Sequence, residues 1–209
     1  MNARLLSLII CTVSICCLFL TPLAAQDRDP EALKPAQEEF TKQHYPSALA
    51  LLRTYLRDHA NDQDAWVWLG ASYYHTGQAQ LALTTLSKAK PKGDLKSLRR
   101  YYMALSYDAL GKSEKAKSLL TQQARSKDLL AEDALFELTV IQFEDGDVSA
   151  TQKNIEDYNK RFSDGRYEKQ MASILEHLTE AGHTEVPGSR RAQYKASYFE
   201  SNPLSLVSI

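Results

Sequence analysis

The side chains best suited to chemistry do not form a catalytic pattern in this sequence. It has five histidines, at His44, His59, His75, His177 and His183, and no two are four residues apart with a glutamate between them. A zinc-peptidase helix requires that spacing. No serine has the glycine-flanked spacing of a nucleophile turn, and no glycine-rich phosphate loop is present. The sequence therefore predicts a protein that is not an enzyme.

One group of residues is a candidate metal site. Glu176, His177, Glu180 and His183 place two imidazoles and two carboxylates near the end of one predicted helix. Gly182 separates His183 from that helix, so the geometry of the four groups is not fixed. The alternative is that they are solvated polar side chains. We expect no metal and no cofactor.

The charge balance excludes several classes of partner. The 209 residues include 25 Lys and Arg and 26 Asp and Glu, which gives a net charge of -1. Such a chain has no overall field to attract nucleic acid, and we expect no nucleic-acid partner. Only 8 glycines and 7 prolines are present, which argues against an all-β chain with many tight turns.

The first 25 residues resemble a signal for export. Residues 5–25 follow Arg4, contain no charged residue, and end in Pro-Leu-Ala-Ala before a polar stretch. This predicts a signal peptide over residues 1–25, cleaved after Ala25. The alternative is an uncleaved membrane anchor, because a helix of about 20 apolar residues spans a bilayer. In both cases the remaining chain is exported, and we expect a periplasmic or secreted location.

The cysteines agree with this division. Cys11, Cys16 and Cys17 all lie in the apolar segment, so the chain after Ala25 has no cysteine. Disulfides, thiol nucleophiles and zinc–thiolate sites are therefore excluded from the mature chain.

An internal repeat of 34 residues is the strongest pattern in the chain. Ala48, Ala82 and Ala116 are spaced by this period, and a leucine follows each of them by four residues. Gly77 and Gly111 stand five residues before the second and third alanines. A repeat of this length is typical of stacked helical hairpins. Small residues let the two helices of a hairpin approach closely, and each glycine permits a left-handed turn between them.

The second repeat resembles the signature of the tetratricopeptide-repeat family. The matching residues are Trp66, Leu69, Gly70, Tyr73, Gly77, Ala82 and Ala89. The resemblance implies an all-α solenoid of about four hairpins with a right-handed superhelical twist. We expect helices at residues 31–43, 46–59, 62–75, 78–89, 95–110, 112–125, 129–144, 148–162 and 166–181. The last is a capping helix with Tyr167, Met171, Ile174, Leu175 and Leu178 on its apolar face. The repeat domain then covers residues 26–181, and residues 182–209 form a flexible tail.

The resemblance also implies a concave groove that binds a peptide segment. The family register places its residues at Val67, Ala71, Tyr74, His75, Tyr101, Leu105, Asp108, Phe136, Val140 and Phe143. In the first repeat the register gives Leu33, Gln37 and Phe40. This set is apolar and aromatic, which suits a segment with hydrophobic anchors. If the register is shifted by one residue, Tyr74, Tyr101 and Phe143 are core residues instead.

Family members that clamp an acidic carboxyl terminus carry basic and amide side chains at five groove positions. Here those positions hold Leu33, Gln37, Trp68, Leu98 and Tyr102, so we expect no such clamp.

The sequence therefore predicts an exported scaffold, of bacterial envelope type, that binds a protein or peptide partner. One alternative is an anchored assembly factor of outer-membrane, Tol-Pal or pilus type, which would contact the membrane through residues 5–25. A carbohydrate-binding module or enzyme would need acids beside groove aromatics, for which Asp108 near Tyr74 and Tyr101 is the only hint. Six basic residues between Lys88 and Arg100 are either a second binding face or a solvated surface. The oligomeric state is not predicted.

Overall fold

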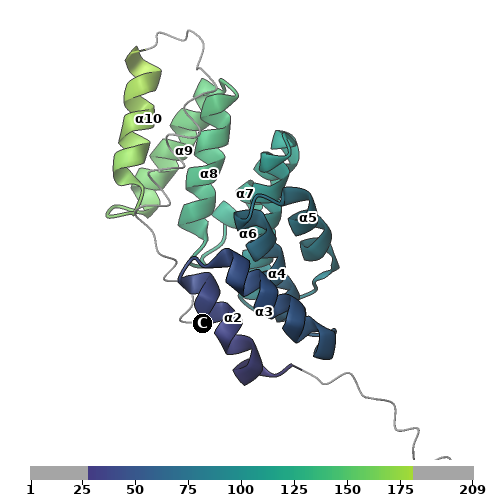
Figure 1. The fold of residues 1–209 in the computed structure, drawn as a ribbon. Coiled ribbons are helices and arrows are strands. Elements are labelled where there is room, and N and C mark those ends of the chain that lie inside the picture. Colours follow the sequence, from purple (N-terminus) through teal and green to yellow (C-terminus); the bar gives the residue numbers. More distant parts are fainter. Residues whose placement is uncertain (1–27, 181–209) are drawn as a thin grey trace, which may run out of the picture.

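The computed structural model describes residues 28–180, and within that range the chain forms helices joined by short turns (Figure 1). They are α2 (Pro30–Thr41), α3 (Tyr45–Asp58), α4 (Gln63–His75), α5 (Ala79–Lys88), α6 (Leu95–Ala109), α7 (Ser113–Ala124), α8 (Ala131–Glu144), α9 (Val148–Arg161) and α10 (Glu168–Glu180). The predicted all-α solenoid of four hairpins and a capping helix is confirmed. The predicted signal peptide or anchor, the helix stop at Gly182 and the tail lie outside the described residues. Within residues 28–180, no helix has the length and apolar character needed to cross a membrane.

The first helices of the hairpins lie on the inner side of the stack. Each hairpin pairs two consecutive helices, from α2 with α3 to α8 with α9, and α10 packs on α9. α4 also packs on α2 and α6, whereas the second helices of the described hairpins make no comparable contacts with one another. Helices on the inside of a curved stack are closer together than those on the outside. α2, α4 and α6 therefore line the concave side.

Left-handed turns join the two helices of every hairpin. Gly77, Gly111 and Gly146 have φ of 76°, 70° and 75°. In the first hairpin the residue with positive φ is Gln43, at 63°, which the sequence did not indicate. The helix bounds differ from the predicted ones by one or two residues, partly because capping residues such as Asp62 lie just outside the helix.

Small residues set the spacing inside the second hairpin. A Cβ added at Gly70 would lie 2.5 Å from Cγ of Leu86, so α4 and α5 could not keep their present distance. The alanines of the 34-residue repeat, Ala48, Ala82 and Ala116, are all fully buried. The proposed role of the small residues is confirmed.

The capping helix buries one face and exposes the other. Met171, Ile174 and Leu178 of α10 are buried, as is Tyr167 just before the helix. Leu175 was also expected on the apolar face, and that is wrong: it is 37% exposed. One residue after Ile174, it is turned by about 100° around the helix, away from the buried face.

We predict that Gly70→Ala destabilises the protein although alanine is the better helix former. The new methyl group collides with Leu86, and overpacking of this kind costs about 1 to 3 kcal/mol. The free energy of unfolding in urea measures the effect.

Leu86→Ala supplies the matched test. Alone it leaves a cavity and costs about 2 to 5 kcal/mol, but it also removes the atoms that the alanine at position 70 meets. The double variant should therefore be more stable than the sum of the two losses predicts. Strict additivity would contradict the close contact.

Candidate functional site

Most of the predicted groove residues are buried. Val67, Ala71, Tyr101, Leu105, Asp108, Phe136, Val140 and Phe143 are at most 4% exposed, and all but Asp108 belong to the hydrophobic core. Tyr74 and His75 are partly buried. The burial of Tyr101 and Phe143 is that expected of core residues. Their part in binding a partner stays a prediction.

His75 belongs to an aromatic cluster that joins the first three hairpins. Its ring stacks on Tyr45, with centroids 4.0 Å apart and planes at 4°. The edge of its ring meets Phe40 at 5.5 Å, and its Nε2 lies 2.9 Å from the hydroxyl oxygen of Tyr102. Burial lowers the pKa of His75 to about 4, so the imidazole is neutral at pH 7. This histidine connects the repeats.

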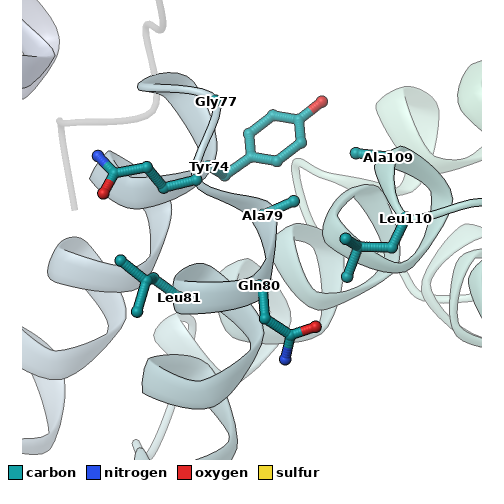
Figure 2. Close-up of a pocket in the computed structure, with 8 residues that line it drawn as sticks. Tyr74, Gly77, Ala79, Gln80, Leu81, Ala109 and Leu110 are labelled. Carbon is teal, nitrogen blue, oxygen red and sulfur yellow. The ribbon is translucent and has the colours of Figure 1, made fainter.

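Tyr74 borders a shallow hollow between the second and third hairpins. Figure 2 shows its ring pointing towards Ala109. The hollow encloses about 400 Å³ and is lined by Tyr74, Gly77, Gln78, Ala79, Gln80, Leu81, Ala109 and Leu110. No carboxylate or amine lines it, so it offers apolar contact and the uncharged polar groups of Tyr74, Gln78 and Gln80.

A second hollow lies on the inner side, where α2, α4 and α6 meet the loop before α8. It encloses about 450 Å³, and we call it the Trp68 hollow. Its lining residues are Arg28, Gln37, Asp64, Trp68, Lys92, Asp94, Leu95, Ser97, Leu98, Lys127, Asp128, Leu129 and Leu130.

Sequence reasoning named only part of this lining. Gln37, Trp68 and Leu98 appeared as clamp positions, and Lys92 as a member of the basic cluster. Lys127 and Leu129 were missed: the predicted helix began at residue 129, whereas both residues lie in the loop before α8. The adjacent pair Leu129-Leu130 in a polar loop was the available signal.

The apolar part of the Trp68 hollow combines buried and exposed side chains. Trp68, Leu98 and Leu130 are 6%, 7% and 5% exposed, whereas Leu129 is 64% exposed. Leu129 is the most exposed large apolar side chain among the described residues. Within that part of the chain, Nε1 of Trp68 is buried and has no hydrogen-bond acceptor. A buried N–H without an acceptor costs free energy.

Two acids at the edge of the hollow, Asp64 and Asp128, are held by fixed partners. Arg28 Nη1 lies 2.8 Å from Asp64 Oδ2. Burial raises the pKa of Asp64, and the guanidinium of Arg28 acts against that shift. Ser97 Oγ donates to Asp128 Oδ2 at 2.7 Å, and the Leu130 N–H donates to Asp128 Oδ1 at 3.0 Å.

The exposed charges at the hollow are of both signs, because Asp94 is exposed there and makes no ion pair within residues 28–180. Burial acts to raise the pKa of Asp128, but its hydrogen bonds outweigh burial and keep the pKa below its ordinary value. Lys92 and Lys127 are exposed and make no ion pair within residues 28–180. The hollow thus offers apolar surface, two exposed ammonium groups and the exposed carboxylate of Asp94.

The other candidate sites have structural roles in the described chain. In the basic cluster, Arg99 Nε donates to the Leu86 carbonyl at 2.6 Å, and Arg100 donates to Gln123 at 2.9 Å, so these two are not simply solvated. At the candidate metal site, His177 Nδ1 lies 2.6 Å from the Ser173 carbonyl oxygen, and His183 lies outside the described residues. Among residues 28–180 no three histidine, cysteine or acidic side chains are grouped to hold a metal ion.

We predict that His75 makes the protein less stable as the pH falls from 7 to 4. The unfolded chain binds a proton near pH 6.5, whereas the folded chain does so near pH 4. Between these values protonation favours unfolding, by up to about 3 kcal/mol at pH 4. Urea unfolding at pH 7 and pH 4.5 measures the loss.

The loss of stability at low pH should shrink in His75→Gln, which removes the buried imidazole. It should persist in His44→Gln, because the side chain of His44 is 62% exposed. Equal losses in the two variants would contradict the buried, neutral state of His75.

Comparison with known families agrees with this geometry. Two family models of the tetratricopeptide repeat match the chain, one over residues 33–95 and the other over residues 100–122. Comparisons with curated proteins and with solved structures gave no match. The matched residues coincide with the first three hairpins, from α2 to α7. The chain therefore contains tetratricopeptide repeats, which generally mediate interactions between proteins.

Proposed function

We propose that this protein is an exported scaffold of a bacterial cell envelope that binds a protein or peptide segment without catalysis. The binding site is the Trp68 hollow on the concave side of the repeats. Its occupant is a segment with an apolar side chain and a nearby carboxylate.

The exposed side chain of Leu129 above a buried apolar floor carries this proposal. An apolar anchor from a partner would cover Leu129 and contact Leu98 and Leu130. A carboxylate of the partner would pair with the exposed ammonium group of Lys92 or Lys127. Extended and helical peptides bind grooves in this way, through spaced hydrophobic anchors.

The proposed location rests on the sequence of the first 25 residues. The apolar segment 5–25 ends in small residues and contains all three cysteines. An anchored assembly factor is the competing form of the same scaffold, in which this segment stays in the membrane.

Leu129→Asp should weaken partner binding and leave the fold intact. A carboxylate at the centre of an apolar contact costs binding free energy, and we expect affinity to fall at least about tenfold. The melting temperature should change little because Leu129 is 64% exposed.

Leu51→Asp is the matched control, because Leu51 is 40% exposed and lines none of the hollows described above. A photo-crosslinking residue at position 129 should capture a partner that the same residue at position 51 does not. Equal capture from both positions, or unchanged affinity in Leu129→Asp, would contradict the assignment of the hollow.

Export predicts a mature chain that begins at Gln26. The intact mass of protein recovered from its native host tests this directly. Full-length protein in the membrane fraction would favour the anchored form instead.

A further inference from the structure

A third hollow lies on the outer side of the stack, between α3 and α5 and over α4. It encloses about 670 Å³, and we call it the arginine groove after Arg53 and Arg57 in its lining. Its walls come from two second helices that make no extensive contact with each other, and its floor is α4. Trp66 in this floor is two residues from Trp68, so the two side chains point about 200° apart around α4. The arginine groove and the Trp68 hollow therefore open on opposite sides of α4.

Two arginines of α3 are the charged side chains that line the arginine groove. Arg53 and Arg57 are one helical turn apart and exposed, and neither forms an ion pair with a residue in the range 28–180. Nη2 of Arg57 donates to Oγ1 of Thr54 at 3.3 Å, but a hydroxyl group is neutral and does not balance the charge. Both guanidinium groups are therefore accessible to an anion.

The packing of the repeats does not require these two arginines. The 34-residue period places Ser87 and Pro91 at the positions in the second hairpin that correspond to Arg53 and Arg57. The second hairpin packs on its neighbours without a basic pair at this place. The pair is therefore a property of this groove and not of the solenoid.

The floor of the arginine groove is aromatic and apolar. Nε1 of Trp66 donates to the Ala60 carbonyl oxygen at 2.9 Å, which fixes the indole ring. Trp66 and Tyr73 are partly buried, so each keeps part of its surface accessible. Leu56 and Leu69 are buried beside them. An apolar or aromatic side chain of a ligand can therefore pack on the accessible parts of the two rings.

The spacing of the two guanidinium groups indicates which ligand fits. Residues four apart on a helix are separated by about 6 Å along its axis. In an extended peptide, side chains two residues apart lie on one face and are separated by about 7 Å. Two acidic residues with one residue between them therefore match Arg53 and Arg57. Each carboxylate can accept two parallel hydrogen bonds from one guanidinium group.

We propose that the arginine groove is a second binding site, which binds an extended acidic segment of another protein. Two carboxylates of this segment pair with Arg53 and Arg57, and an apolar side chain packs on Trp66 and Tyr73. Charge complementarity identifies the occupant, because no acidic side chain of the described chain lines the groove. With one site on each side of α4, the protein holds two partners at the same time.

Binding of a defined peptide tests the proposal. The probe is Gly-Glu-Leu-Glu-Leu-Glu-Gly labelled with tetramethylrhodamine, and the control peptide has glutamine in place of each glutamate. Fluorescence anisotropy should show an affinity for the acidic probe at least about tenfold above that for the control, because neutral amides form no ion pair. Equal affinities for the two peptides would overturn the proposal.

Two double variants with the same change in net charge separate specific binding from general electrostatics. Arg53→Gln with Arg57→Gln should weaken binding of the acidic probe at least about fivefold. Lys153→Gln with Lys160→Gln removes two exposed charges of α9 and should retain the full affinity. Unchanged affinity in the arginine variant, or equal losses in both variants, would overturn the proposal. Far-UV circular dichroism checks that each variant keeps its helices.

A third double variant distinguishes the arginine groove from the Trp68 hollow. Lys92→Gln with Lys127→Gln removes the two ammonium groups of that hollow. A loss of affinity in this variant but not in the arginine variant would place the probe in the Trp68 hollow. That result would overturn the second site and leave the proposed function standing.

Vesicles of phosphatidylglycerol separate a protein partner from a membrane surface. We expect the arginine variant and the unmodified protein to sediment equally with these vesicles. Sedimentation that depends on Arg53 and Arg57, without binding of the acidic probe, would assign the groove to lipid headgroups and would overturn the proposal.

Discussion

The close approach of α4 and α5 at Gly70 is the contact on which the rest of the structure depends. The side chain of Leu86 occupies the space where a Cβ of residue 70 would stand, and Ala82 is fully buried in the same hairpin. Because the two helices are so close, each hairpin is a thin layer that can stack on the next one. That stacking brings α4 against α6 and places Trp68 and Leu98 side by side at the floor of the Trp68 hollow.

Neighbouring hairpins pack on one another through aromatic rings, whereas the two helices of one hairpin pack through small residues. Phe40, Tyr45, His75 and Tyr102 come from three hairpins and meet in one cluster. Edge and stacked contacts of this kind contribute about 0.5 to 1.5 kcal/mol beyond the burial of apolar area. His75 can take part only when it is neutral, which its lowered pKa ensures at pH 7. A histidine that looks available for chemistry in the sequence is therefore a structural residue.

The sequence predicted the features that depend on local spacing. The 34-residue period placed the hairpins, and Gly77 and Gly111 marked the left-handed turns. It could not show that Gln43 makes the equivalent turn in the first hairpin, because that residue has no special preference for positive φ. The sequence also could not decide whether Tyr101 and Phe143 are groove residues or core residues. Both interpretations place these side chains on the inner face of a first helix. Their burial depends on what packs over that face, which the period does not encode.

The Trp68 hollow was missed for a related reason: its most exposed apolar residue is in a loop that lies outside the repeat pattern. That loop is nevertheless well ordered by its hydrogen bonds. Asp128 accepts from Ser97 on α6, from Gln123 on α7 and from the Leu130 N–H, so one carboxylate ties the loop to two helices. Leu129 is held between two residues that are fixed in this way. A partner that covers Leu129 would therefore lose little conformational entropy in ordering the loop. Most of the free energy of the apolar contact would then contribute to binding affinity. In this solenoid the repeats supply the rigid frame, and a loop between two of them presents the exposed anchor.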